Sequence, residues 1–321
     1  MAKKSAVAMM RIVIAGAGGF AGLLAQQLSP TGHSILVLST KQHPDFEENY
    51  DVQVAAIDYN IPDVLQYVLQ GVDLVISTVG GVEQLNLIDA ARLARVRTFV
   101  PCEFEGALAQ RPAPADDPFD EYSHVALSQL QLWHTSRSFS MRYTVFSCGI
   151  FYERFAPGGL RSYNMGGRLR IPNQGDYLID VGNGTAELPE TDPQGRQIHI
   201  TLTSAFDVAR FVAAAVELGI ETWPREFRMR GARITPQRIQ QFCSEVRRVE
   251  FEVISRPYNE LMEWLNYHHQ NNNEAGWLAI QHLLQTANGR YNIGNANLND
   301  LVNIEPKGFR QWLSENWGPA Q

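Results

Sequence analysis

An apolar segment that runs straight into a glycine-rich turn lies near the start of the chain and limits what the chain can fold into. Residues 11–22 read Arg-Ile-Val-Ile-Ala-Gly-Ala-Gly-Gly-Phe-Ala-Gly, and residues 20–28 continue with helical periodicity. A glycine turn between a strand and a helix lets backbone N–H groups approach phosphate oxygens, and the helix adds the positive end of its dipole. The segment therefore predicts a dinucleotide site, although glycines in such a turn can be purely structural. The expected cofactor contacts are Gly16, Gly18, Gly19, Phe20 and Gly22.

The overall charge excludes several classes of partner. The chain has 321 residues and a formal net charge of -7, so no basic field is available to attract nucleic acid or an anionic membrane surface. Its length suffices for one large domain or two closely packed ones. The cysteines are too few and too scattered for a disulfide framework or a zinc site, which favours a reducing compartment and predicts no metal. They are Cys102, Cys148 and Cys243.

The first residues bear a superficial likeness to a signal peptide, with Lys3 and Lys4 before a short apolar patch. The patch continues through Arg11 into the first expected strand, so cleavage would destroy that strand. No uninterrupted apolar run approaches the roughly 20 residues that a membrane helix needs. We therefore expect a soluble, cytoplasmic protein without a membrane partner.

Strands and helices alternate through residue 101, which predicts a doubly wound parallel sheet of the α/β class. Residues 34–38 form a continuous apolar run, as in a strand buried on both faces. Further strands are expected at 52–58, 72–78 and 97–100, with helices at 62–69 and 84–93. Beyond these we expect a helix at 122–136, strands at 143–148 and 198–203, a surface loop at 183–196, a helix at 206–218, and mostly helical structure from Pro257.

The residues after the second expected strand favour NADP(H) over NAD(H). In this fold an acidic side chain at that position binds the adenosine ribose of NAD, whereas a cation accommodates the 2′-phosphate of NADP. The positions carry Ser39, Thr40 and Lys41, without an acid. Residues that let the backbone pass close beneath a cofactor end the fourth strand, namely Thr78, Val79 and Gly80.

The carboxyl end of the fifth expected strand is the place where such sheets bind ligands. Pro101 and Cys102 stand there as expected cofactor contacts, followed by Glu103 and Phe104. Residues 107–120 are rich in proline and acidic residues, a composition typical of a mobile flap over a pocket or of a long connector.

Three stretches resemble the NmrA-like and isoflavone reductase-like branch of the atypical short-chain dehydrogenases. They are residues 14–22, 71–81 and 99–104, with weaker likeness at 58–59, at 143–144 with Gly149 and Phe151, and at 207–209. The likeness implies an NAD(P)-binding Rossmann domain and a smaller, mostly helical C-terminal substrate domain. The expected division assigns 9–155, with 198–231 returning to it, to the Rossmann domain, and 156–197 with 232–321 to the substrate-binding portion.

Reductases of that family resemble one another in a lysine at the start of the helix that follows the flap. This chain has lysines only at positions 3, 4, 41 and 307, so the family's catalytic lysine is missing. The matching stretch begins Tyr122-Ser123-His124. A histidine exchanges protons near neutral pH, and a tyrosine can donate a proton to a developing oxyanion. We expect His124 and Tyr122 to be catalytic, with Glu103 orienting either one; a polar surface position is the alternative for His124.

Phe104, Phe151 and Tyr152 are expected to line the substrate pocket, with core packing as the alternative for Tyr152. The favoured function is an NADPH-dependent reductase of a small aromatic, enone or quinone-like metabolite of secondary metabolism, because hydride chemistry belongs to the cofactor. One alternative is an NAD(P)-sensing NmrA-like regulator that presents a surface to a partner protein. Another is a non-redox enzyme that catalyses a cyclisation or elimination with His124 or Glu103 as base.

Overall fold

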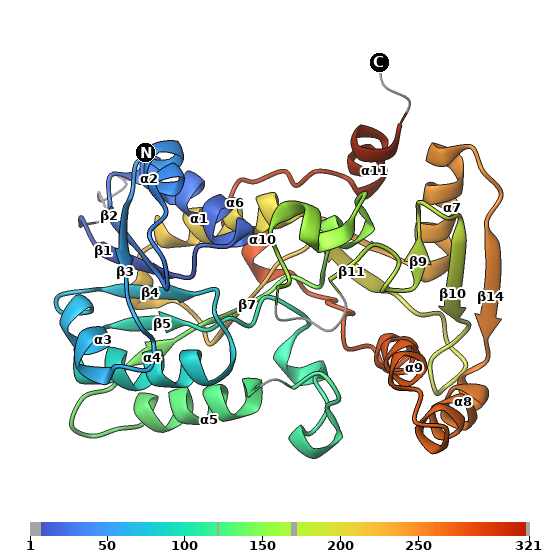
Figure 1. Ribbon diagram of the computed structural model, residues 1–321, viewed down its shortest axis with the longest axis horizontal. Coiled ribbons are helices and arrows are strands. Elements are labelled where there is room, and N and C mark those ends of the chain that lie inside the picture. The colour runs from blue at the N-terminus through green and yellow to red at the C-terminus, as the bar shows by residue number, and fades with distance from the viewer. Residues whose placement is uncertain (1–7, 121, 168–171, 319–321) are drawn as a thin grey trace.

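The computed structural model describes residues 8–120, 122–167 and 172–318. Figure 1 shows a sheet flanked by helices at one end of the long axis, and a second group of strands and helices from the C-terminal half at the other end. Within the described ranges, no helix combines the length and the apolar character that crossing a membrane requires.

A six-stranded sheet forms the first part of the molecule and confirms the doubly wound α/β fold. Its strands are β1 (Arg11–Ala15), β2 (Ser34–Ser39), β3 (Gln53–Ala56), β4 (Leu74–Ser77), β5 (Thr98–Val100) and β6 (Arg142–Tyr143), all paired in parallel. The order β3-β2-β1-β4-β5-β6 changes direction between β1 and β4. A sheet of this order opens a crevice at the carboxyl ends of β1 and β4, where this fold binds dinucleotides.

Alternate side chains of β1 separate two layers of helices. Ile12 and Ile14 pack into one core with α1 (Gly19–Leu28) and α6 (Ala205–Val216). Val13 and Ala15 pack on the opposite face, which is covered by α3 (Pro62–Val68), α4 (Gly81–Leu93) and α5 (Ser123–His134). The short α2 (Pro44–Tyr50) lies against α1. Because successive side chains of a strand point to opposite faces, a strand covered on both sides is a continuous apolar run in the sequence.

The strand expected at 143–148 is divided in two. β6 pairs with β5, whereas β7 (Val145–Ser147) pairs in parallel with β12 (Glu226–Arg228). Thr144 lies at the break, and its hydroxyl donates a hydrogen bond of 2.8 Å to the Pro224 carbonyl. The chain around residue 227 therefore returns to the strand that follows β6.

Two smaller sheets lie toward the other end of the molecule. One contains β8 (Ile150–Phe151), β11 (Ile200–Thr203) and β13 (Ala232–Ile234). The other contains β9 (Ile179–Asp180), β10 (Thr185–Pro189) and β14 (Glu252–Arg256), in the order β14-β10-β9. The surface loop expected at 183–196 is therefore wrong for residues 185–189. Ala186 and Leu188 are buried, and they hold β10 between its two neighbours.

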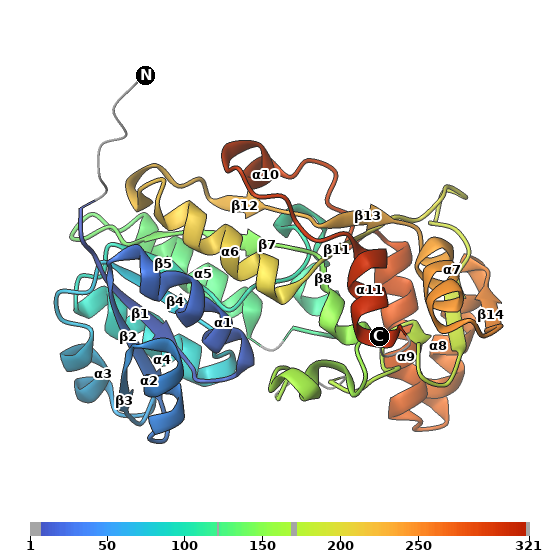
Figure 2. The same ribbon diagram turned by 90° about the horizontal axis from the view of Figure 1, so that it is seen from above.

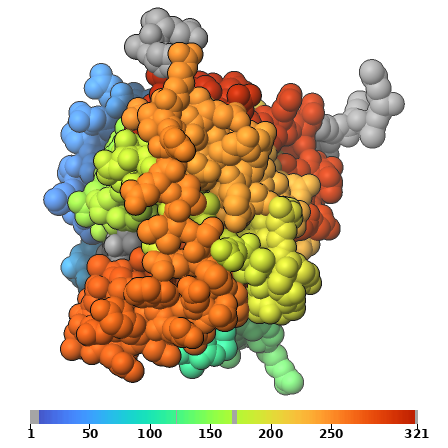
Figure 3. Space-filling model, turned by 90° about the vertical axis from the view of Figure 1, so that its right-hand side faces the viewer, coloured from blue at the N-terminus to red at the C-terminus, as the bar shows by residue number. Residues whose placement is uncertain are grey.

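The C-terminal helices are α7 (Pro236–Arg247), α8 (Tyr258–Gln270), α9 (Glu274–Ala287), α10 (Asn297–Leu301) and α11 (Phe309–Trp317). Side chains of α7, α9 and α11 share a second hydrophobic core that includes Ile239, Leu283 and Leu313. Figure 2 shows α7, α8, α9 and α11 gathered at the end opposite the six-stranded sheet. Seen from that end, segments coloured orange cover most of the surface (Figure 3).

Gly149 lies between β7 and β8, where two backbones approach each other closely at the junction of the sheets. It has a φ of +74°, and an added Cβ would lie 2.1 Å from the Thr201 carbonyl oxygen. We expect Gly149→Ala to lower the free energy of unfolding by at least about 3 kcal/mol, measured by denaturant titration. The matched control is Gly32→Ala, because Gly32 has a φ of +79° with nothing within 4 Å. It should cost only about 1 kcal/mol, and equal losses would show that the two backbones do not meet as described.

Candidate active site

The glycine turn after β1 meets the turn after β4 at the centre of the crevice. Gly16 has a φ of +104°, and a Cβ there would lie 2.3 Å from the Thr78 hydroxyl oxygen. The Gly16 amide donates to the Leu38 carbonyl at 2.8 Å, and the Thr78 hydroxyl donates to the Ala15 carbonyl at 2.7 Å. Only glycine combines this φ with so close an approach. The two turns are therefore fixed against each other where the strand order changes direction.

The Gly19 amide, at the start of α1, already has an acceptor. It donates a hydrogen bond of 2.8 Å to the carbonyl of Asn164. A Cβ built on Gly19 would lie 1.7 Å from the Tyr163 carbonyl oxygen. The amide thus points out of the turn, as binding of a phosphate oxygen requires, but a peptide carbonyl takes the acceptor position.

Residues 160–165, which we call the capping segment, are held in place from two sides. Leu160 and Met165 belong to the same hydrophobic core as α1. The Tyr163 hydroxyl lies 2.9 Å from the side-chain oxygen of Asn316 on α11 and donates to it. Glycines with positive φ flank the segment at positions 158, 159 and 166. Glycine at both ends gives the backbone the freedom that a hinge needs.

The other expected cofactor contacts lie along the same edge. Ser39 is buried, with its hydroxyl accepting a hydrogen bond of 3.3 Å from the Lys41 amide, and Thr40 and Lys41 are exposed. After β4, the Val79 carbonyl accepts a hydrogen bond from the Ser77 hydroxyl, and Gly80 directly precedes α4. On α1, a Cβ added to Gly22 would lie 2.8 Å from the Tyr50 hydroxyl oxygen. Pro101 is buried, and the Cys102 amide donates to the side chain of Gln84 at 2.6 Å. The remaining position, Gly18, precedes α1 directly.

Phe20 links the glycine turn to two of the residues expected in the substrate pocket. Its ring centroid lies 4.7 Å from that of Phe104, in an edge-on arrangement, and 5.4 Å from that of Phe151. Tyr152 lies elsewhere: its side chain is fully buried against Phe309 and Trp312, and its hydroxyl donates to the Lys307 carbonyl at 3.0 Å. This environment matches the alternative of core packing for Tyr152.

Glu103 is buried beside the start of α5 and has a cationic partner. Arg111 donates a hydrogen bond of 2.5 Å to its carboxylate. Burial raises the pKa of Glu103 above its ordinary value, although the Arg111 charge opposes this shift. Glu103 is therefore paired with Arg111 of the flap, residues 107–120.

A chain of ion pairs fixes the flap, residues 107–120, to the rest of the site. Arg111 also lies 3.1 Å from Glu105, and Glu105 lies 3.1 Å from Arg290. Arg290 in turn holds Asp117 at 2.6 Å. The expected flap is thus clamped near both of its ends in this structure. The sequence could not reveal this clamp, because Arg290 follows Glu105 by 185 residues.

His124 has an acidic partner that the sequence analysis did not identify. The Asp120 carboxylate contacts His124 Nδ1 and accepts from the His124 amide at 3.0 Å. His124 and Tyr122 are each about half exposed, with the His124 side chain at 45 % and Tyr122 at 50 %. Because Nδ1 is engaged by Asp120, Nε2 is the ring nitrogen that can exchange a proton with a ligand. Glu103 does not take this orienting position.

No cluster of three or more His, Cys, Asp or Glu side chains that could hold a metal ion occurs in residues 8–120, 122–167 and 172–318. The strand order and the glycine turn at the crevice define a protein with the NAD(P)-binding Rossmann fold. Residues 9–274 match the NmrA-like family, and the chain belongs to that family.

Known relatives agree with this assignment. Oxidoreductase BOA1 of Botryotinia fuckeliana (strain B05.10) is 27% identical over 221 residues, which cover 65% of this chain and 67% of the relative. The crystal structure of isoflavone reductase is similar with a TM-score of 0.69 at 15% identity, over 96% of this chain and 99% of that chain. The triphenylmethane reductase of Citrobacter sp. complexed with NADP(H) is similar with a TM-score of 0.65 at 15% identity, over 95% of this chain and 99% of that chain. Because both solved structures are only 15% identical to this chain, the similarity shows a shared fold.

Arg111→Gln tests the buried pair with Glu103. Breaking such a pair costs about 3–5 kcal/mol, because it leaves an uncompensated buried charge. The pKa of Glu103 is already raised and should rise further, so the folded state holds its proton to higher pH than the unfolded state does. The loss of unfolding free energy should therefore be smallest near about pH 5 and grow as the pH rises toward about 8.

Denaturant titrations at both pH values measure this effect. The control is Arg97→Gln, an exposed arginine that pairs with Asp73 at 3.4 Å, which should change stability by less than about 1 kcal/mol. A pH-independent loss in Arg111→Gln, or an equal loss in the control, would refute the assigned role of Arg111.

Proposed function

We propose that this protein is an NADPH-dependent reductase of a small aromatic, enone or quinone-like metabolite. The observation that carries the proposal is the junction in the crevice, where Gly16 meets Thr78 and the Gly19 amide points outward to an acceptor. A similar protein is named an oxidoreductase, and a protein of similar fold is a reductase complexed with NADP(H). When bound, NADPH supplies the hydride.

The residues after β2 support NADPH over NADH as the bound form. Thr40 and Lys41 are exposed beyond the end of β2, beside the buried Ser39. Two hydroxyl groups and an ammonium can bind a 2′-phosphate, and no carboxylate among residues 39–41 repels it.

His124 is our choice for the proton donor. Asp120 holds Nδ1 and thereby directs Nε2 outward from the first turn of α5, the position where the family's reductases carry a lysine. A protonated imidazole can give its Nε2 proton to the oxyanion that develops on a carbonyl during reduction, and the hydroxyl of Tyr122 can add a hydrogen bond. The rings of Phe104 and Phe151 offer an apolar surface for an aromatic substrate.

The capping segment favours a second candidate, an NAD(P)-sensing regulator. Binding of a diphosphate at Gly19 would displace the Asn164 carbonyl, and Tyr163 connects the same segment to α11. The occupancy of the crevice would thereby alter the surface around α11, which a partner protein could recognise.

NADPH oxidation in the presence of an aryl enone or a naphthoquinone tests the reductase. We expect faster oxidation of NADPH than of NADH, and a fall in kcat of about a hundredfold in His124→Gln, because general acid catalysis contributes about that much. The matched control is His269→Gln, an exposed histidine on α8 that should retain wild-type rates. If wild-type protein binds NADPH but oxidises it with neither probe, the regulator becomes the better account.

Tyr163→Phe tests the capping segment. Loss of the hydroxyl removes the hydrogen bond to Asn316, which is worth up to about 1 kcal/mol, or about a fivefold change in Kd. Because the segment competes with the diphosphate, the variant should bind NADPH more tightly by up to that factor in a calorimetric titration. Tyr67→Phe, on the exposed side of α3, should bind as wild type does. Weaker binding in Tyr163→Phe would mean that Tyr163 supports the cofactor site instead of closing it.

A further inference from the structure

The strand β14 is the open edge of the small sheet β14-β10-β9. It lies last in the strand order, and Figures 1 and 2 show it at the end of the molecule farthest from the six-stranded sheet. Residues 252–255 are all exposed, among them Val253 at 43% and Ile254 at 45%. The strand contains no proline or lysine, and its register with β10 has no bulge. Such an edge is a template for pairing with another strand.

The hydrogen bonds to β10 show which backbone groups of β14 face the open edge. The Glu252 amide donates to the Gly184 carbonyl at 2.9 Å, and the Arg256 carbonyl accepts from the Glu190 amide at 3.0 Å. In a parallel pair, alternate residues of one strand bond to the same neighbouring strand. Residues 252, 254 and 256 therefore direct their amides and carbonyls toward β10, and residues 253 and 255 direct theirs outward.

This arrangement of outward groups is symmetric about Ile254. A second β14 placed antiparallel, with Ile254 opposite Ile254 of the second copy, sets Val253 opposite Ser255. In this register Val253 and Ser255 form a hydrogen-bonded pair, which exchanges an N–H···O bond in each direction, and the same pair recurs on the other side of the axis. Ile254 then stands in a non-hydrogen-bonded pair, where the side chains of two strands lie closest.

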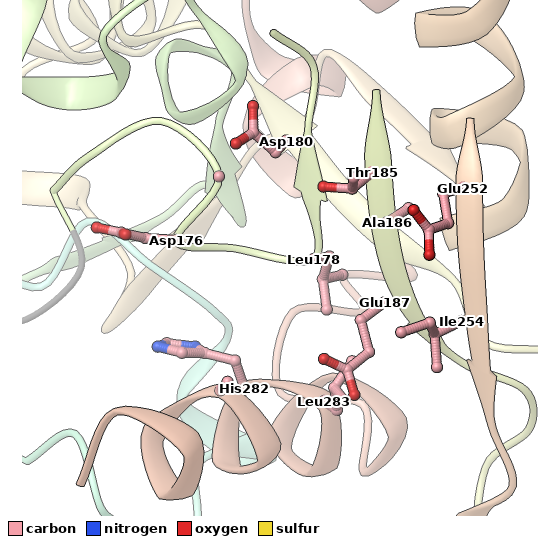
Figure 4. Close-up of a pocket in the computed structure, with 12 residues that line it drawn as sticks. Asp176, Leu178, Asp180, Thr185, Ala186, Glu187, Glu252, Ile254, His282 and Leu283 are labelled. Atoms are coloured by element: carbon pink, nitrogen blue, oxygen red, sulfur yellow. The ribbon is translucent and has the colours of Figure 1, made fainter. Parts of the chain in front are cut away.

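The charges of β14 fit the same register. Side chains of a strand alternate between its faces, and Figure 4 shows Glu252 and Ile254 on the face that also carries Glu187 of β10. In the antiparallel register Glu252 faces Arg256 of the second copy. Arg256 already pairs with Glu187 at 2.6 Å, but a guanidinium has five N–H groups and can bond to a second carboxylate. A parallel pairing in register would place like charges side by side, which is unfavourable.

We propose that the occupant of this edge is a second copy of this chain, and that antiparallel pairing of β14 joins the two small sheets into one. An extended peptide could use the same backbone groups, but the order of Glu252, Ile254 and Arg256 makes the strand complementary to itself. A contact through one strand belongs with the interfaces below about 1,200 Å², which form transient complexes. We therefore expect a dimer that dissociates on dilution.

Analytical ultracentrifugation of the full-length protein over a range of concentrations measures this equilibrium. We expect reversible dimerisation of the wild type. Ile254→Lys sets two ammonium groups against each other on the symmetry axis and should raise the Kd of the dimer at least about tenfold. The matched control is Val82→Lys on α4, which alters an aliphatic side chain of similar exposure, 46%, and should dimerise as the wild type does.

Mixing two variants tests the register. Ile254→Lys and Ile254→Glu should each be monomeric at concentrations where the wild type is dimeric, and an equimolar mixture should form a dimer again, because opposite charges then meet across the axis. A monomeric wild type, a mixture that stays monomeric, or an equal loss of dimer in Val82→Lys and Ile254→Lys would overturn the proposal.

Amide hydrogen exchange of the wild type decides the question if either variant at position 254 does not fold. The amides of Val253 and Ser255 should exchange more slowly at high than at low protein concentration, because pairing protects them, whereas the Glu252 amide is already bonded to Gly184 and should not change. Exchange at Val253 and Ser255 that is independent of concentration would contradict the dimer.

Discussion

The hydrogen bond between the Gly19 amide and the Asn164 carbonyl occupies the donor that our proposal assigns to a phosphate of the dinucleotide. Three features around the crevice position that amide. β1 is buried on both faces, Gly16 lies in close contact with Thr78, and α1 begins at Gly19. A helix N-terminus leaves amides unsatisfied, and they bind whichever acceptor reaches them. Here the Asn164 carbonyl does so, and under the proposed function a phosphate of the dinucleotide replaces it.

Ion pairs hold the flap, residues 107–120, beside the crevice. Glu103, Glu105 and Asp117 alternate with Arg111 and Arg290, and each carboxylate has a guanidinium within hydrogen-bonding distance. Buried ion pairs add little net stability, but they specify geometry because breaking one leaves an unpaired charge. The pairs thereby fix the flap next to the start of α5, where Asp120 orients His124.

The local signals of the first half were sufficient to predict its fold. Alternation of apolar strands with helices, and the glycine turn, predicted the doubly wound sheet, and the order of the strands confirms it. The division of β6 from β7 at Thr144 was missed, because it depends on the approach of residues 224–228 from far along the chain. β10 was missed for a similar reason: its five residues lie between polar turns, and its burial depends on β9 and β14.

Prediction of the site was also limited by contacts between residues that are not linked by any sequence motif. Residue types indicated Glu103 and His124, but their partners Arg111 and Asp120 carry no motif, and Arg290 joins them only through the fold. The capping segment gave no signal, since any residue can offer a backbone carbonyl.

The most direct test of the account is NMR of glycine-labelled protein titrated with NADP+. The account predicts that the Gly19 amide signal moves in a saturable manner, and that the amide exchanges with solvent more slowly in the complex, as phosphate oxygens replace the Asn164 carbonyl. Saturable binding that leaves the Gly19 signal unmoved, or no binding at all, would contradict it.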